Sequence, residues 1–179
     1  LPTAEIEDLP QVLTDLVAAD PRLDAVRAVA LAGGGPVIDG RIDLTNAGLL
    51  IDPAAIGDRC DFDQVLLMND FEAVAWSLPA MTADKLHRIG GNGMAPATDP
   101  LAPKVVIGPG TGLGVAAWVP VDGHSGRPVP TEGGHVTLAA RTADEATVIQ
   151  DAAMRHGHVS AERLVSGPGL LEMLQSIAP

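Results

Sequence analysis

The sequence predicts an α/β fold, because segments typical of strands alternate with segments typical of helices along its 179 residues. Short apolar runs at residues 26–31 and 64–68 are typical of buried strands, and each ends in small or polar residues. A third apolar run leads into the glycine-rich stretch GPGTGLG at residues 108–114. No internal repeat is evident.

Composition and charge exclude several classes of protein. The chain is 46% hydrophobic with a net charge of −12, and Lys85 and Lys104 are its only lysines. This acidity argues against nucleic acid or an anionic membrane surface as a partner. A bound phosphate would therefore need backbone amides, a metal ion or arginine.

Three further absences bear on location and processing. No apolar run approaches the roughly 20 residues that span a bilayer, and the charged and apolar regions of a signal peptide are missing. The single cysteine, Cys60, excludes an intrachain disulfide and a cysteine-built metal site, which favours a reducing, cytoplasmic setting. The first residue is Leu1 rather than Met, so we expect that a preceding segment was removed or is not shown.

The first third of the chain carries clear helix and turn signals. Asp8 is placed to cap a helix over residues 8–19, and the strand at 26–31 runs into three glycines. Asp39-Gly40 is a type I′ turn pair and predicts a hairpin over residues 37–44. Asp52 followed by Pro53 predicts the start of a short helix.

Asn69 and Asp70 follow the second predicted strand and precede a helix that we expect to run through residue 78. In α/β folds, catalytic side chains often lie where a strand ends and a helix begins. A carboxylate at this point could take a proton from an alcohol, and the neighbouring amide could orient the same hydroxyl. The alternative is an Asx turn that only caps the next helix. Pro79 ends this helix and indicates a boundary between lobes.

The glycine stretch predicts a phosphate-binding hairpin. Gly110, Thr111 and Gly112 can present backbone N–H groups and a hydroxyl to an anion. A Rossmann or Walker loop would open a helix here, but residues 115–119 are typical of a strand and Pro120 would break a helix. We therefore expect strand, glycine turn and strand, which disfavours a Rossmann-type oxidoreductase. A plain hairpin without a ligand is the alternative.

The rest of the chain alternates loops with helices. Residues 90–103 and 120–130 are rich in glycine or proline and predict surface loops, and residues 136–140 predict a strand. Thr142 and Glu145 form a capping box for a helix that we expect to end at residue 155 or 156. Ser160 is placed to cap a short helix, and a last helix is predicted over residues 170–177.

Several polar residues of this second part are candidate ligands. Glu132 and His135 flank two glycines, and their acceptor and donor groups suit a polyhydroxylated ligand, although a solvated surface turn explains them equally well. Glu162 near a helix start has a simple electrostatic explanation. His156 and His158 lack a third ligand at a helpful spacing, so we expect no protein-built metal site.

Taken together, these motifs resemble the bacterial glucokinase family, which are hexokinase-like sugar kinases of the actin/Hsp70-type ATPase superfamily. Their order and approximate spacing match over nearly the whole chain. The matching pieces are Leu44-Thr-Asn46, Asn69-Asp-Phe71, Gly108-Pro-Gly-Thr-Gly-Leu-Gly114, Glu132-Gly-Gly-His135, Gly157-His-Val-Ser-Ala-Glu-Arg163 and Ser166-Gly-Pro-Gly169.

The resemblance implies roles for individual residues. Asp70 matches the catalytic base that acts on the sugar 6-hydroxyl. The residues that match ligands of the other glucose hydroxyls are Asn69, Glu132, His135 and Glu162, together with Asn46 in a loop near the sugar. Gly110, Thr111 and Gly112 match the motif that faces the β- and γ-phosphates of ATP.

The resemblance also implies an actin-like, ribonuclease-H-like ATPase fold with two lobes and a cleft, here incomplete. Residues 1–79 would belong to the smaller lobe and residues 80–179 to the larger. ATP, Mg²⁺ and glucose are the implied cofactors and substrate, and a homodimer is the implied assembly. The family's Asp-x-Gly-Gly-Thr-Asn phosphate loop and C-terminal half are not among these residues, so the chain resembles the middle of a longer enzyme.

The sequence therefore predicts a cytoplasmic glucokinase that transfers the γ-phosphoryl group of ATP to the 6-hydroxyl of glucose. The competing interpretation is a catalytically inactive sugar-binding or regulatory protein on the same fold. The residues leave open whether ATP, ADP or polyphosphate is the donor, and how glucose is distinguished from other hexoses.

Overall fold

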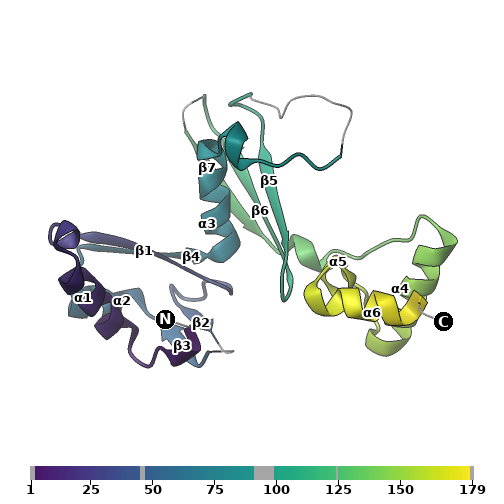
Figure 1. The fold of residues 1–179 in the computed structure, drawn as a ribbon, viewed down its shortest axis with the longest axis horizontal. Helices are drawn as coiled ribbons and strands as arrows, with labels where there is room; N and C mark the ends of the chain where they lie inside the picture. The colour runs from purple at the N-terminus through teal and green to yellow at the C-terminus, as the bar shows by residue number, and fades with distance from the viewer. Residues whose placement is uncertain (1–2, 45–46, 91–98, 124, 178–179) are drawn as a thin grey trace. The chain divides into compact units, whose positions relative to one another are not determined.

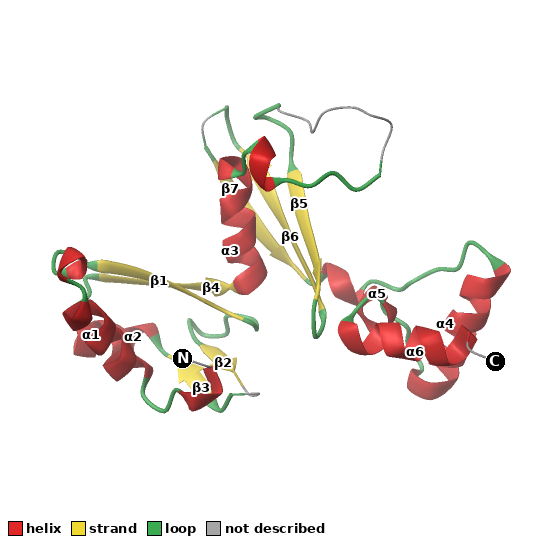
Figure 2. Ribbon diagram, in the orientation of Figure 1, coloured by secondary structure: helices red, strands yellow, loops and turns green. Residues whose placement is uncertain are grey.

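The computed structural model describes residues 3–44, 47–90, 99–123 and 125–177 (Figure 1). The chain divides into two compact units, Leu1–Ala73 and Val74–Pro179, and each is described here by itself. Helices and strands alternate in the first unit, as predicted, whereas the second unit has three consecutive strands followed by three helices (Figure 2). Within the described part of the chain, no helix combines the length and apolarity needed to cross a bilayer.

The first unit contains a parallel pair of strands, β1 (Ala28–Gly33) and β4 (Gln64–Asn69). Both strands were predicted, and their register runs from Ala28 opposite Gln64 to Gly33 opposite Asn69. The expectation that both strands are buried was wrong. Alternate residues are exposed, with Leu66 59% accessible, because helices pack on one face only.

Two capped helices, α1 (Leu9–Ala19) and α2 (Pro53–Cys60), pack against that face (Figure 1). Asp8 accepts a hydrogen bond from the Gln11 N–H at 3.1 Å, and Asp52 accepts one from the Ala54 N–H at 3.0 Å. Both caps were predicted, and each satisfies a backbone donor that the helix leaves free. The core of this unit consists of Leu13, Ile42, Ile51, Ile56 and Phe62.

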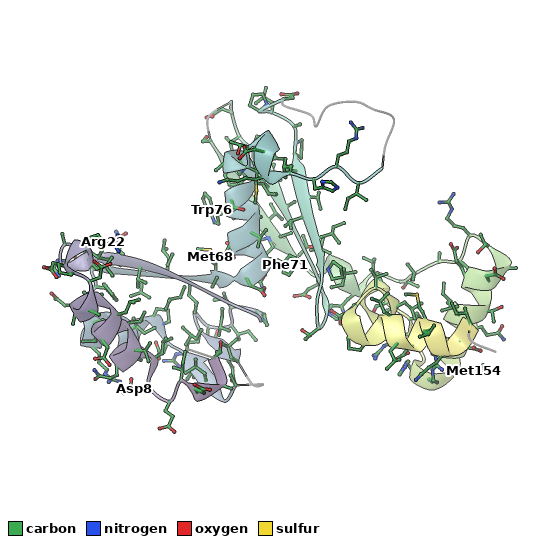
Figure 3. The ribbon with its side chains drawn as sticks, viewed as in Figure 1. Asp8, Arg22, Met68, Phe71, Trp76 and Met154 are labelled. Carbon is green, nitrogen blue, oxygen red and sulfur yellow. The ribbon has the colours of Figure 1, made fainter. Side chains whose placement is uncertain are left out.

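The Arg59 guanidinium links the two helices. Its Nη2 atom lies 2.8 Å from Asp8 Oδ2, and this hydrogen bond, with that from the Gln11 N–H, holds the pKa of the Asp8 carboxyl below its ordinary value. Asp8 (labelled in Figure 3) therefore both caps α1 and ties it to α2.

The predicted turn at Asp39-Gly40 is confirmed, because both residues have positive φ, 48° and 75°. The strands around it differ from the prediction. Only one bridge, between Ile38 and Arg41, closes the turn. Strand β2 (Ile42–Leu44) instead pairs antiparallel with β3 (Leu49–Ile51), so the hairpin lies one strand further along the chain.

The second unit contains an antiparallel sheet of β5 (Lys104–Pro109), β6 (Leu113–Pro120) and β7 (Gly126–Thr131). The predicted strand, glycine turn and strand are confirmed by the β5–β6 pairing. The prediction of a loop through residue 130 was wrong, because residues 126–131 form β7. Pro128 and Pro130 occupy alternate positions of this outer strand. Proline has no backbone N–H, and it is tolerated there because every second residue of an outer strand donates no hydrogen bond to the adjacent strand.

Three helices complete this unit: α4 (Ala143–His156), α5 (Ala161–Leu164) and α6 (Gly167–Ile177). The Thr142–Glu145 capping box and the Ser160 cap are present as predicted. Helix α6 begins three residues before the prediction, with the Gly169 N–H donating to Ser166 Oγ at 3.2 Å. The core of this cluster consists of Val148, Ala152, Val159 and Leu164.

Residues 136–140 do not form the predicted strand. They make one isolated bridge, between Thr137 and Ser160, which joins them to the segment before α5. Residues 136–140 are apolar because they pack against the helices, as Leu138 does against the core of the helical cluster, and not because they pair in a sheet.

Helix α3 (Asp70–Ser77) begins in the first unit and ends in the second. Trp76, near its end, packs against Trp118 of β6 with ring centroids 5.2 Å apart and planes tilted by 58°. Trp76 is labelled in Figure 3. The remaining helical segments are single 3₁₀ turns: η1 (Thr3–Glu5), η2 (Pro21–Leu23), η3 (Leu78–Ala80), η4 (Ala83–Lys85) and η5 (Gly133–His135).

Candidate functional site

Asn69 caps helix α3 and ties it to the loop after β1. Its Oδ1 atom accepts hydrogen bonds from the Phe71 N–H at 2.9 Å and the Glu72 N–H at 3.3 Å. Its Nδ2 atom donates to the Gly35 carbonyl at 3.1 Å. The capping interpretation is therefore confirmed for Asn69. One amide N–H remains beyond the bond to Gly35, because an asparagine side chain carries two donors.

Asp70 is exposed at the first position of α3, directly after the end of β4. Its Oδ1 atom accepts from the Phe71 N–H at 2.9 Å. Its Oδ2 atom lies over Gly34, where an added Cβ would be 3.4 Å away. The carboxylate thus lies at the carboxyl ends of two parallel strands, where α/β folds commonly bind ligands.

The glycine run after β1 is the part of this region that sequence reasoning missed. Gly33 lies opposite Asn69 in the parallel pair, so the loop that follows it adjoins the start of α3. The sequence showed three glycines at the end of a strand, but only the register of the β1–β4 pair reveals that they lie next to Asp70. Asn46, a predicted sugar ligand, lies outside the described residues.

In the second unit, the glycine turn forms the tip of the β5–β6 hairpin. The Gly110 N–H donates to the Gly112 carbonyl at 2.8 Å, and Gly110 and Thr111 are exposed. The Gly167 N–H, at the start of α6, donates to the Gly110 carbonyl at 2.8 Å. The turn is thus held from behind while its tip stays accessible to a ligand.

Glu162 of α5 contacts this same turn. Its Oε2 atom accepts the Leu113 N–H at 2.9 Å, although the two residues are 49 positions apart. The contact requires glycine at position 112, because an added Cβ would lie 2.5 Å from Oε2. The structure therefore joins a predicted sugar ligand to the predicted phosphate turn.

Glu132 and His135 flank η5, beside the same hairpin. His135 Nε2 lies 3.6 Å from Glu132 Oε2, and their side chains are 60% and 79% exposed. The Thr131 hydroxyl fixes the approach to η5, since it donates to the Val115 carbonyl at 2.8 Å and accepts the Gly133 N–H at 3.1 Å. Gly134 lies against the Leu113 carbonyl, where a side chain would not fit.

The segment after η5 is hydrogen-bonded to the segment that carries Glu162. The Ala161 N–H donates to the Val136 carbonyl at 2.8 Å, and the Leu138 N–H donates to the Val159 carbonyl at 3.0 Å. His135 directly precedes the acceptor Val136, and Glu162 directly follows the donor Ala161, so the bond between them holds the two candidate ligands near each other. The second unit brings together the predicted residues Gly110, Thr111, Gly112, Glu132, His135 and Glu162.

The two remaining histidines have local partners. His156 Nε2 lies 2.9 Å from Glu172 Oε2, and His158 Nε2 lies 2.9 Å from the Thr137 hydroxyl. Among the residues that the structure describes, no group of three or more histidine, cysteine, aspartate or glutamate side chains could hold a metal ion.

These features define an α/β protein with an exposed carboxylate at a strand-to-helix junction. It also has a glycine hairpin beside carboxylate and imidazole groups. Backbone N–H groups at such a turn suit phosphate, and the carboxylates suit hydroxyl donors. Within the second unit, the hairpin and its neighbouring side chains suit a phosphorylated and a polyhydroxylated ligand.

Comparison with known proteins identifies the family. The glucokinase family model matches residues 1–179, and the chain belongs to the glucokinase family. The glucokinase of Saccharophagus degradans is 40% identical over 152 residues, which cover 85% of this chain and 46% of that protein. The chain spans about half the length of the curated relatives it matches.

Solved structures agree with this assignment. A crystal structure of glucokinase from an Antarctic psychrotroph has a TM-score of 0.84 and 31% identity, covering 99% of this chain and 53% of that one. Glucokinase from Balamuthia mandrillaris in complex with glucose has a TM-score of 0.56 and 19% identity, covering 92% and 50% of the two chains, and supports the fold alone. The predicted family and its α/β, actin-like fold are confirmed.

Proposed function

We propose that the intact protein is an ATP-dependent glucokinase that transfers the γ-phosphoryl group of ATP to the 6-hydroxyl of glucose. The observation that carries this proposal is the hydrogen bond between Glu162 and the glycine turn. It places a group suited to sugar hydroxyls beside a turn suited to phosphate. The choice of ATP and glucose as substrates is supported by membership of the glucokinase family over residues 1–179.

Asp70 is the general base in this proposal. Its exposed carboxylate would accept the proton of the 6-hydroxyl as the sugar oxygen bonds to the γ-phosphorus. The bond between the γ-phosphorus and its bridging oxygen breaks, and ADP leaves. Such transfer depends mainly on positioning and charge stabilisation.

Sugar recognition is assigned to five residues. Glu132, His135 and Glu162 offer carboxylate and imidazole groups on the second unit. On the first unit, Asn69 has an amide N–H to spare beyond its bond to Gly35. Asn46 is assigned from the family motif alone.

Phosphate recognition is assigned to the turn of Gly110, Thr111 and Gly112. Since the Gly110 N–H is bonded to the Gly112 carbonyl, the exposed tip offers the N–H groups of Thr111 and Gly112 and the threonine hydroxyl. When bound with ATP, Mg²⁺ would neutralise charge on the phosphates, which is its usual role in such sites.

We further propose that residues 1–79 belong to the smaller lobe and residues 80–179 to the larger lobe of the whole protein. The division of the chain into two compact units supports this. The enzyme is proposed to be a cytoplasmic homodimer, which rests on the family alone.

A coupled assay tests the activity. The intact protein is incubated with Mg-ATP and glucose, and formation of ADP and glucose 6-phosphate is followed. We expect both products in equal amounts and dependent on glucose. A protein whose thermal stability rises with glucose, but which forms neither product, would be a sugar-binding protein, and the kinase proposal would be wrong.

A further inference from the structure

The carboxylate of Glu162 lies at the phosphate turn. Its Oε2 atom accepts the Leu113 N–H at 2.9 Å, on the strand residue that follows the turn. It also covers Gly112, since an added Cβ there would lie 2.5 Å from Oε2 and 3.2 Å from Cδ. An anionic group therefore covers one side of a turn proposed to bind an anion.

This contact has two opposing effects on phosphate. It fixes the turn, together with the bond from the Gly167 N–H to the Gly110 carbonyl at 2.8 Å. At the same time, the carboxylate accepts the Leu113 N–H, which is then not available to phosphate, and its negative charge repels a phosphate that comes close. The repulsion weakens if hydroxyl donors engage the carboxylate, because they draw it from Leu113 and disperse its charge.

We propose that Glu162 is a positioning residue that keeps the glycine turn unfavourable to phosphate until a sugar hydroxyl engages its carboxylate. The inference rests on the proposed function and adds a coupling between the two substrates. Binding of the sugar would raise the affinity for the nucleotide. By linkage, the nucleotide would raise the affinity for the sugar by the same factor.

The test measures nucleotide affinity in the intact protein without sugar. Binding of Mg²⁺ with the non-hydrolysable ATP analogue AMP-PNP is titrated by calorimetry for the unmodified protein, Glu162→Gln and Glu162→Ala. Removing the negative charge should lower the Kd of the analogue by about fivefold. A purely structural role predicts the opposite sign, because loss of the Leu113 contact would loosen the turn and raise the Kd.

Asp144→Asn is the matched control. It removes one negative charge from the same unit, at an exposed position in the first turn of α4 that has no part in the proposed site. We expect its Kd for AMP-PNP to match that of the unmodified protein. Adding saturating glucose should lower the Kd of the unmodified protein and change that of the Glu162 variants less.

The coupled glucose assay, run on the same unmodified protein, tests the proposed kinase activity separately from the role of Glu162. Glucose phosphorylation together with tighter AMP-PNP binding in both Glu162 variants supports the inference. Glucose phosphorylation with an unchanged or raised Kd in folded variants overturns the inference and leaves the enzyme assignment standing. Absence of glucose phosphorylation overturns the proposed function, and the inference with it.

Discussion

At the scale of single residues, Asn69 and Asp70 are neighbours with different tasks. Asn69 directs its carbonyl oxygen to two backbone N–H groups of α3, which makes it a structural cap. The Asp70 carboxylate is exposed and accepts the N–H of its neighbour Phe71. The cap holds the first turn of the helix in place, so that the carboxylate keeps its position at the strand ends.

A glycine substitution tests the packing of the phosphate turn. In Gly112→Ala, the new methyl would lie 2.5 Å from Glu162 Oε2, so the contact with Leu113 must break or shift. Because the carboxylate is the far end of a flexible side chain, the cost comes mainly from its lost hydrogen bond with the Leu113 N–H, about 1–2 kcal/mol. We expect a lower urea midpoint in the intact protein.

Gly110→Ala is the control for stability, since nothing lies within 4 Å of its added methyl. Its urea midpoint should stay close to that of the unmodified protein. An equal loss of stability in both variants would mean that the turn does not pack on Glu162 as described.

At the scale of elements, the sequence predicted what local chemistry controls. The caps at Asp8, Asp52, Thr142 and Ser160 all formed, because each depends on residues within one helical turn. Strand β7 was missed because two prolines suggested a loop, and only the pairing with β6 makes their alternation acceptable.

The Asp8–Arg59 pair predicts a pH-dependent contribution to stability. The pKa of Asp8 is held below its ordinary value of 3.8, mainly by its hydrogen bond with Arg59. The contribution is therefore complete above pH 3.8 and is lost as the pH falls through the lowered pKa. Asp8→Asn keeps a good helix cap but removes the charge, so it should lower the urea midpoint at pH 7.

Urea unfolding of both proteins between pH 7 and pH 2.5 checks this. The difference between their midpoints should shrink below the ordinary pKa of an aspartate, because the unmodified carboxyl then becomes neutral as well. A difference that stays constant over this range would show that the ion pair contributes nothing.

At the scale of the whole molecule, the order of the motifs indicated the family, and the comparisons confirmed it. The contact between Glu162 and the glycine turn could not be predicted, because 49 residues separate its partners and neither motif implies it. The pairing that brings Gly33 beside Asn69 was hidden for the same reason. Both contacts depend on how distant segments pair and pack, which the residue types of each motif do not reveal.

The two units predict separable unfolding of the 179-residue chain. Each has its own core, and both tryptophans lie in the second unit. The chain has no tyrosine, so tryptophan fluorescence reports on that unit alone, whereas far-ultraviolet circular dichroism reports on both. We expect the two urea transitions to differ in midpoint, and coincident curves would show that the units unfold as one.

The kcat for glucose phosphorylation by Asp70→Asn, in the intact protein, tests whether Asp70 is the general base. Losing a general base should lower kcat by about 10²-fold or more while glucose binding is largely retained. Asp63→Asn, which removes the same charge from an exposed site outside the proposed machinery, should keep its kcat. A kcat close to that of the unmodified enzyme in Asp70→Asn would contradict the assignment of Asp70 as the base.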